Sequence, residues 1–335
     1  MTVGGVEWVA RKLMPLDQVR SMAYRLAAPI AAPLYANREY RVAWLGTVLV
    51  CTAFGLSLLV PLWLLSLGPV ILGVPHLLSD LRYLVMRPGL HRRPALWFSA
   101  PTLLAVSFGA GPVVGLVAMV PAILAAEGAE WRKLVLLGVW VVLTGLAWFF
   151  DIDFQLVFMH LHNLIAVALW WSWRPRNIVA WVVPCLVLVG SVMLLAGVAE
   201  PVLNSLGGWT AEWTGNSFSN FLEQIAPPNS GSLAPRFVLL FCFLQAVHYG
   251  IWLRLIPEDD RPRPAPRPFQ ASWRSLVDDF GSLPLFIVGT VTLAIAIWGL
   301  VDLPGARLGY LQLAAGHGYL ELAAAAYFLA KGRCS

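Results

Sequence analysis

Histidines and carboxylates inside long apolar stretches are the residues of this sequence that could carry chemistry. His76 is followed by Asp80, and His317 by Glu321, at a spacing of four residues. On a helix, this spacing puts both side chains on one face, about 6 Å apart along the axis. Ionisable groups inside a bilayer are unfavourable unless they pair or bind a metal. The two pairs therefore indicate a functional site.

Three more histidines, His160, His162 and His248, also lie near the middle of apolar stretches. A single buried histidine is often a packing residue bonded to a neighbouring carbonyl. Histidines at similar depth in four stretches, however, find their most favourable partners in each other. Converging neutral imidazoles are what a transition-metal site requires. We therefore predict a metal site with ligands among His76, His160, His162, His248 and His317.

His160 and His162 present a choice, because side chains two residues apart point to opposite sides of an ideal helix. We expect one of them to bind the metal and the other to serve another purpose, unless a π-bulge turns both inward. The sixth histidine, His91, stands beside Arg92 and Arg93 in a polar loop. We expect it to be solvated.

Asp80 and Glu321 are predicted to act beside the metal rather than on it. Each is a helical turn from its histidine, farther than the roughly 2 Å of a metal–ligand bond. They could orient the imidazoles or face a proton path, which makes both candidate catalytic residues. The alternative is that they pair with Arg82 or Arg254 near a membrane interface.

Tyrosines near the histidines are further candidates. Tyr249 and Tyr319 closely follow His248 and His317, and Tyr83 follows Asp80. Their hydroxyl groups could donate hydrogen bonds to a ligand or an oxygen species. Tyrosines at helical spacing also serve as packing residues, and that reading stays open.

The elements that position these residues follow from the composition. Hydrophobic residues make up 59% of the chain and charged residues 12%, with a mean hydropathy of +0.72. Soluble domains of this length do not have such a composition, whereas polytopic α-helical membrane proteins do. The net charge of +5 comes from residues at the ends of the apolar stretches and does not indicate nucleic-acid binding. The cysteines at 51, 185, 242 and 334 show no metal-binding or disulfide spacing.

An all-α transmembrane bundle of about ten spans is the predicted fold. The expected spans are 42–65, 67–86, 95–110, 112–127, 132–150, 152–173, 178–199, 236–256, 283–301 and 308–330. Lys and Arg gather in the segments 36–41, 87–94, 131–133, 174–177, 257–282 and 331–333, which ten spans place on one side. The positive-inside rule makes that side cytoplasmic. We therefore expect a multi-pass protein of the cytoplasmic membrane with both termini inside.

Three segments outside the spans are distinctive. Residues 1–36 mix basic and apolar side chains, as in an amphipathic segment on the membrane surface, and 37–335 form a single transmembrane domain. The outer loop 200–235 places Trp209, Trp213, Phe218, Phe221, Leu222 and Ile225 on roughly one helical face. It predicts an interfacial helix, a lid or an ordinary connector. The proline-rich stretch 257–282 predicts an extended cytoplasmic linker.

The octapeptide Gly73-Val-Pro-His-Leu-Leu-Ser-Asp80 resembles the Gly-x-Pro-His-x-x-x-Asp signature of the Brp/Blh family. Its members are bacterial and archaeal membrane enzymes that cleave β-carotene to retinal. The resemblance implies a helical bundle with non-haem Fe(II) held by histidines and with O2 as co-substrate. Leu77 stands where members tend to have glycine, and Gln245 where a histidine is expected. These departures concern the substrate more than the metal.

The first hypothesis is therefore a non-haem iron oxygenase of the membrane that acts with O2 on a lipid-soluble isoprenoid, carotenoid or lipid. The second is a haem protein of electron transfer, with histidines from facing spans as axial ligands. The third is a transporter with a relay of histidines and carboxylates. A haem absorption band would distinguish the second from the first, and broken helices in two similar halves would favour the third.

Overall fold

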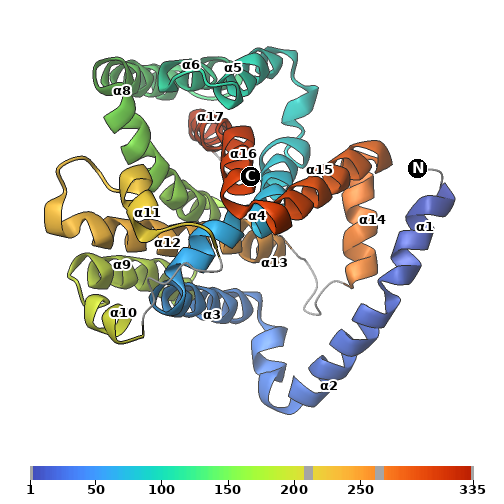
Figure 1. Ribbon diagram of the computed structural model, residues 1–335. Helices are drawn as coiled ribbons and strands as arrows, with labels where there is room; N and C mark the ends of the chain where they lie inside the picture. Colours follow the sequence, from blue (N-terminus) through green and yellow to red (C-terminus); the bar gives the residue numbers. More distant parts are fainter. Residues whose placement is uncertain (1–2, 207–213, 261–267, 333–335) are drawn as a thin grey trace.

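The computed structural model describes residues 3–206, 214–260 and 268–332, and all the regular elements among them are helices (Figure 1). The all-α class is confirmed. Six helical stretches are long and apolar enough to cross a membrane: Arg38–Leu59, Pro61–Met86, Glu130–Ser172, Ile178–Leu195, Gly231–Asp259 and Ser282–Val301. The count of ten spans and the orientation of the chain stay predictions.

The helices that build the bundle are α3 (Arg38–Leu59), α4 (Pro61–Asp80), α5 (Ser99–Ser107), α6 (Pro112–Val117), α7 (Met119–Ala125), α8 (Glu130–Ser172), α9 (Val182–Leu195), α12 (Ala234–Gly250), α15 (Ser282–Val301), α16 (Leu303–Ala314) and α17 (His317–Lys331). Helix α17 packs against α7 and α8, α16 packs against α4 and α15, and α12 packs against α3, α4, α8 and α9. Helices α4, α12 and α17 thus meet in the interior, and their side chains can form a common site.

Several elements differ from the predicted spans in length. The stretches Pro94–Ser107 and Pro112–Ala125 are shorter than the ~30 Å of a bilayer core at 1.5 Å per residue. Helix α8 is one element of 43 residues, although Asp151 has a non-helical φ of 26°. This kink lies between the expected spans 132–150 and 152–173. The expected span 308–330 is broken between α16 and α17.

The two helices that carry His76 and His248 both change from α to π geometry just after the histidine. Helix α4 continues as the π-helix η1 (Leu81–Met86), and α12 continues as η6 (Ile251–Leu255). A π-turn widens the helix, and such turns are frequent at functional sites. The bulge considered for His160 and His162 is not found, since that part of α8 is regular.

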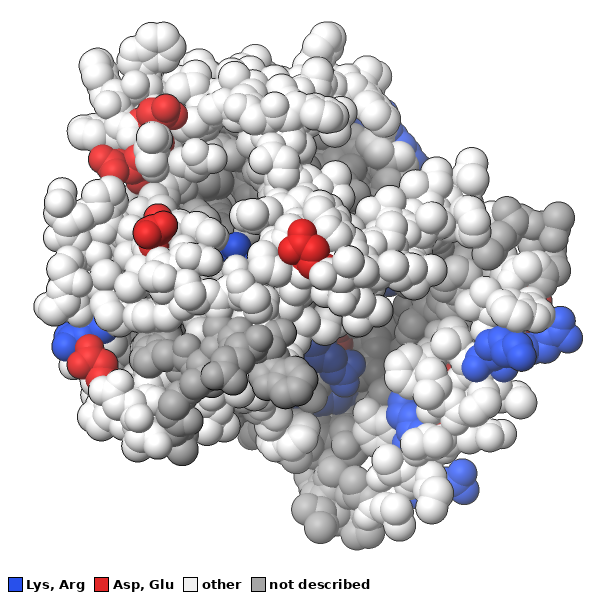
Figure 2. Space-filling model, viewed as in Figure 1, with Lys and Arg blue, Asp and Glu red and all other residues white. Residues whose placement is uncertain are grey.

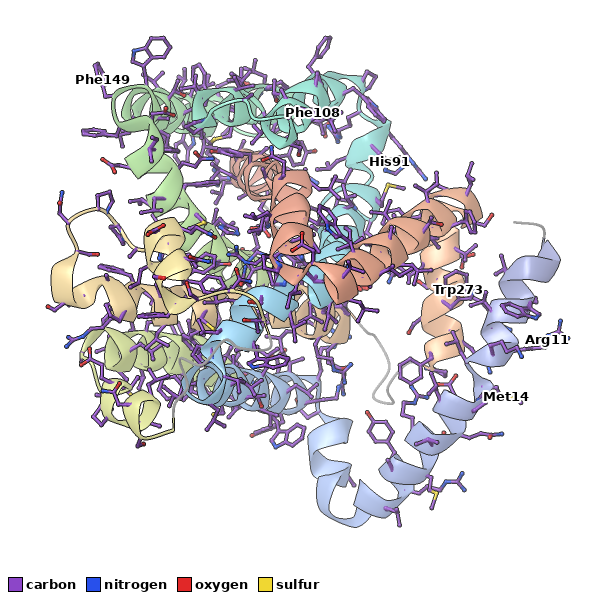
Figure 3. The ribbon with its side chains drawn as sticks, viewed as in Figure 1. Arg11, Met14, His91, Phe108, Phe149 and Trp273 are labelled. Carbon is purple, nitrogen blue, oxygen red and sulfur yellow. The ribbon has the colours of Figure 1, made fainter. Side chains whose placement is uncertain are left out.

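The N-terminal helices α1 (Val3–Lys12) and α2 (Met14–Ala36) extend away from the bundle and carry many of the basic side chains visible in Figure 2. They dock on α14 (Phe269–Phe280), where the Trp273 indole donates to the Val6 carbonyl at 3.1 Å (Figure 3). Arg274 pairs with Glu7 at 3.0 Å, and this hydrogen bond lowers the pKa of Glu7. The prediction of an extended linker is therefore wrong for residues 269–280, because the docked arm gives them a surface on which to fold.

An acidic run at the end of the α12 stretch joins several parts of the bundle. Glu258 and Asp259 are buried in α13 (Ile256–Asp259), again within the expected linker. Glu258 accepts from Arg41 at 2.5 Å, and Asp259 lies 3.2 Å from Arg174 and 2.5 Å from Arg176. These ion pairs fix α13 in place, so 256–259 is part of the bundle.

The expected outer loop contains two short helices, α10 (Glu200–Leu206) and α11 (Phe218–Ile225). Phe221 and Ile225 of α11 are buried against Leu62 and Val238. The apolar face of α11 thus faces the bundle instead of lying free on a membrane surface. Trp209 and Trp213 lie outside the described residues.

The remaining elements are four short 3₁₀ helices: η2 (Leu90–Arg92), η3 (Pro94–Phe98), η4 (Ile178–Trp181) and η5 (Gly231–Leu233). Of these, η2 and η3 lead from η1 into α5 and border the site.

Candidate metal centre

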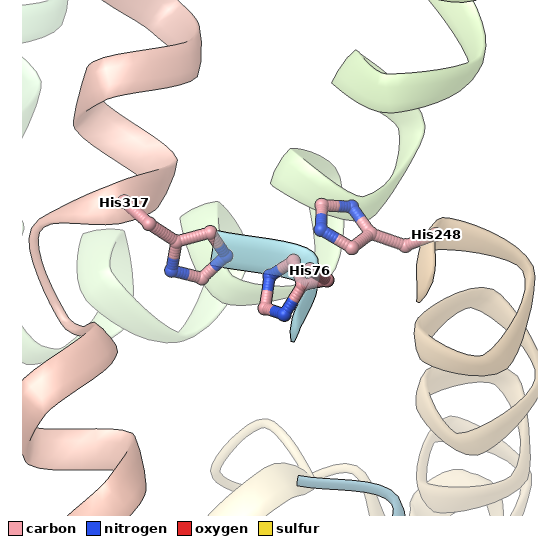
Figure 4. Close-up of side chains that lie close together, drawn as sticks. All are labelled: His76, His248 and His317. Atoms are coloured by element: carbon pink, nitrogen blue, oxygen red, sulfur yellow. The ribbon is translucent and has the colours of Figure 1, made fainter. Parts of the chain in front are cut away.

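Three histidines from three helices converge in the middle of the bundle (Figure 4). His76 comes from α4, His248 from α12 and His317 from the first position of α17. One ring nitrogen of each lies within 4.8 Å of the others. His76 and His248 are fully buried. The fold therefore brings together three imidazoles that are far apart in sequence.

Two glycines allow this convergence. A Cβ atom at Gly316 would lie 2.4 Å from the Leu103 carbonyl oxygen, so only glycine lets α5 approach the break before α17. A Cβ atom at Gly73 would lie 2.3 Å from the Tyr310 ring. Gly73 thus lets Tyr310 reach the helix that carries His76. The absence of a Cβ atom at Gly73 and Gly316 therefore allows the close approach of the elements around the site.

In His317 and His76, the ring nitrogen that does not face the centre is hydrogen-bonded. Nδ1 of His317 lies 2.6 Å from the Ala314 carbonyl, which can only accept, so Nδ1 carries the proton and Nε2 keeps its lone pair. Nδ1 of His76 lies 3.3 Å from the Tyr310 hydroxyl. Metal-binding histidines in proteins are commonly oriented in this way.

The two carboxylates lie at the centre rather than a turn away from it. Asp80 Oδ2 is 3.8 Å from His76 Nε2, and Glu321 Oε1 is 3.5 Å from His248 Nε2. Asp80, His317 and Glu321 also form a second group of ligand atoms within 4.8 Å of one another. Two ligands of one ion, each about 2.1 Å from it, lie at most about 4.2 Å apart. Distance therefore does not exclude these carboxylates as ligands, contrary to expectation, because backbone rise does not fix the separation of side-chain tips.

Neither Asp80 nor Glu321 pairs with Arg82 or Arg254. Arg82 instead bonds Asp279 at 2.6 Å, and Arg254 lies 3.3 Å from Glu258. Both arginines are thus engaged outside the centre.

His162 faces the centre and His160 does not. The His162 ring lies 5.2 Å from the rings of both His248 and His317, and its Nδ1 is 2.7 Å from the Met159 carbonyl. His160 points to the other side of α8, where its ring lies 5.3 Å from Phe241. The two side chains therefore point to opposite sides of α8, as their spacing predicts. His162 is a fourth imidazole beside the centre.

Ligand atoms of the centre lack hydrogen-bond partners. In the described part of the chain this holds for buried atoms of five residues: His76 Nε2, both Asp80 oxygens, both His248 ring nitrogens, His317 Nε2 and Glu321 Oε2. An unpartnered buried polar group typically costs about 1–3 kcal/mol, and more if it is charged. A divalent cation fits this set, because it would bind the lone pairs and balance two carboxylate charges.

The predicted tyrosines lie in three different places. The Tyr249 ring is 4.6 Å from the His76 ring. Tyr319 stacks on Phe158 at 4.5 Å, and its buried hydroxyl has no hydrogen-bond partner among the described residues. Tyr83 packs on Trp173 at 6.2 Å, away from the centre. Tyr249 therefore touches a candidate ligand, whereas Tyr83 is a packing residue.

Two residues of the centre were not among the candidates from the sequence. The Trp252 indole donates to Glu321 Oε1 at 2.7 Å, and the Tyr310 hydroxyl contacts His76. Trp252 follows His248 by four residues, a spacing that could have indicated it. Tyr310 belongs to another helix and reaches the centre only because residue 73 is glycine, so no local pattern could have indicated it.

An apolar cavity of about 500 Å³ opens beside the centre. Asp80 and His317 line it, and so does His91, which is partly buried rather than solvated as expected. Exposed apolar side chains border the cavity, among them Leu81, Trp97, Leu104 and Leu313. A hydrophobic molecule in this cavity would touch both a carboxylate and an imidazole of the centre.

Comparison with known proteins does not place the chain in a family, since no family model, curated protein or solved structure matches it.

Proposed function

We propose that this protein is a membrane enzyme with a non-haem iron centre that oxidises a lipid-soluble substrate with O2. The observation that carries the proposal is the convergence of unpartnered ligand atoms from His76, His248, His317, Asp80 and Glu321 beside an apolar cavity. The resemblance of residues 73–80 to the Brp/Blh signature supports the proposal from the sequence motif, separately from the arrangement of the side chains.

The donor set favours iron over zinc and over haem. Zinc is usually four-coordinate, whereas three imidazoles and two carboxylates offer enough donors for the higher coordination numbers of Fe(II). A haem needs a free disc around its iron for the porphyrin. Two groups of three ligand atoms, each within 4.8 Å, suit a single compact ion better than that disc. The His and carboxylate set also suits Mn(II), so the metal itself must be measured.

Bound Fe(II) would supply the activation of O2 and the oxidising power. The residues of this chain would hold and shield the reaction. His76, His248 and His317 would bind the ion, with Asp80 and Glu321 as anionic ligands that balance its charge. Tyr310 and Trp252 would orient His76 and Glu321 through their hydrogen bonds. The apolar cavity would exclude water and hold the substrate against the open side of the centre.

Metal analysis of the purified protein tests the proposal. The protein would be reconstituted with Fe(II) without oxygen in detergent and assayed for bound metal and for a nitric oxide adduct by electron paramagnetic resonance. We expect one iron per chain and no haem absorption band. His248→Ala and His317→Ala should lose most of the iron.

His160→Ala is the matched control, because His160 is also an intramembrane histidine but points away from the centre. It should keep the iron. Full iron content in the His248→Ala and His317→Ala variants, or a haem band in the wild type, would refute the proposal.

A further inference from the structure

The cavity beside the centre is elongated. It follows η3 and α5, with His91 of η2 lining one end and Ser107, the last residue of α5, lining the other. The five residues of η3 and the nine of α5 together span about 23 Å at 2.0 and 1.5 Å per residue. Figure 3 shows His91 before α5 and Phe108 directly after it. This shape suits a single extended chain.

A cation stands beside the His91 end of the cavity: Arg92 is not itself a lining residue, but it contacts His91, which is. Arg92 Nε donates to His91 Nε2 at 3.4 Å, and the Trp97 indole donates to the His91 carbonyl at 3.0 Å. Arg92 is exposed and has no carboxylate partner among the described residues. Its neighbours differ, since Arg87 pairs with Asp260 and Asp279 while Arg93 pairs with Glu127. One unbalanced positive charge therefore lies at this end.

The rest of the lining offers no second polar end. The hydroxyl of Ser99 donates to the Ala118 carbonyl at 2.9 Å, and that of Ser107 donates to the Leu313 carbonyl at 3.0 Å. Tyr327 also lines the cavity, and the guanidinium of Arg93, which follows Arg92, lies over its ring. Asp80 and His317 line the cavity at the centre itself. Because Gly316 abuts Leu103 within α5, the centre borders the cavity along its length and not at the His91 end.

We propose that the cavity binds a long-chain carboxylic acid, with its carboxylate at Arg92, next to His91, and its apolar chain running along α5 past Asp80 and His317. A single unpaired guanidinium balances a single negative charge, which favours a carboxylate over a phosphate monoester. The centre would then act on a carbon inside the chain, away from the carboxylate. This inference rests on the proposed function for the reaction, whereas binding of the acid needs no metal.

The affinities of the protein for two fluorescent probes test the inference. The probes are cis-parinaric acid and its methyl ester, which share one chain and differ in charge. On the metal-free protein in neutral detergent, we expect saturable binding of the acid, about tenfold tighter than that of the ester. Arg92→Gln should remove this preference and leave ester binding unchanged. Arg25→Gln, at another exposed arginine on α2, is the matched control and should bind both probes like the wild type.

A cavity-filling variant shows where the probes bind. Ala100 lines the cavity, so Ala100→Trp should block both the acid and the ester. Unchanged binding in Ala100→Trp, equal affinity of the wild type for acid and ester, or an unchanged preference in Arg92→Gln would overturn the inference. Displacement of the acid more readily by a single-chain phosphate monoester than by palmitate would overturn the assignment of the carboxylate. The iron content of the same variants after separate reconstitution with Fe(II) reports on the proposed function.

Discussion

The variant Glu321→Gln tests whether Glu321 binds the metal itself or only contacts residues that bind it. Glu321 has two different oxygens: Oε1 accepts from the Trp252 indole at 2.7 Å, and Oε2 is buried without a hydrogen-bond partner. Glutamine has nearly the same shape and can still accept from Trp252. It loses only the negative charge and one donor atom for the metal. The effect of this variant therefore measures what the carboxylate does at the centre.

Trp252→Phe is the matched comparison, because it removes the hydrogen bond and leaves the carboxylate. Loss of such an orienting partner typically weakens metal binding by about 10–100-fold. Glu321→Gln should weaken it by more than about 100-fold, or about 2.7 kcal/mol, because an anionic ligand is lost. The double variant should be no weaker than Glu321→Gln alone, since the tryptophan acts only through the carboxylate.

The assay is competition for Fe(II) against a chelator of known affinity, without oxygen, on each purified variant. Equal and small losses in Glu321→Gln and Trp252→Phe would refute the reasoning. Glu321 would then only orient His248, which lies 3.5 Å from it. Additive losses in the double variant would refute the claim that Trp252 acts through Glu321.

Three further predictions concern positions outside the proposed set of ligands. His162→Ala should lower the affinity for Fe(II) in the same chelator competition, whereas His160→Ala should not, because only the first ring faces the other imidazoles. Gly73→Val should lower both iron content and thermal stability. Its Cβ atom would lie 2.3 Å from the Tyr310 ring and would push that ring away from His76. Asp259→Asn should destabilise the protein by about 3 kcal/mol in denaturant unfolding, because two arginines lose their buried partner. A stability within about 0.5 kcal/mol of wild type would contradict this last prediction.

Composition and residue spacing are enough to predict the class of protein and the kind of side chains at its centre. A hydrophobic content of 59% requires helices whose backbone groups bond internally. The i and i+4 spacing placed Asp80 with His76 on one face because helix geometry is local. The two-residue spacing likewise separated His160 from His162. These conclusions depend only on the regular repeat of the α-helix.

Which of these groups meet depends on how the helices pack. Only the packing of the bundle brings Glu321 of α17 to His248 of α12 and to Trp252 of η6. The packing also placed His91 at the cavity and His160 against Phe241. Such contacts depend on where glycines and breaks let helices approach, as at Gly316. Helical periodicity fixes the face on which a side chain lies, but the distance between faces of different helices is set by the whole bundle.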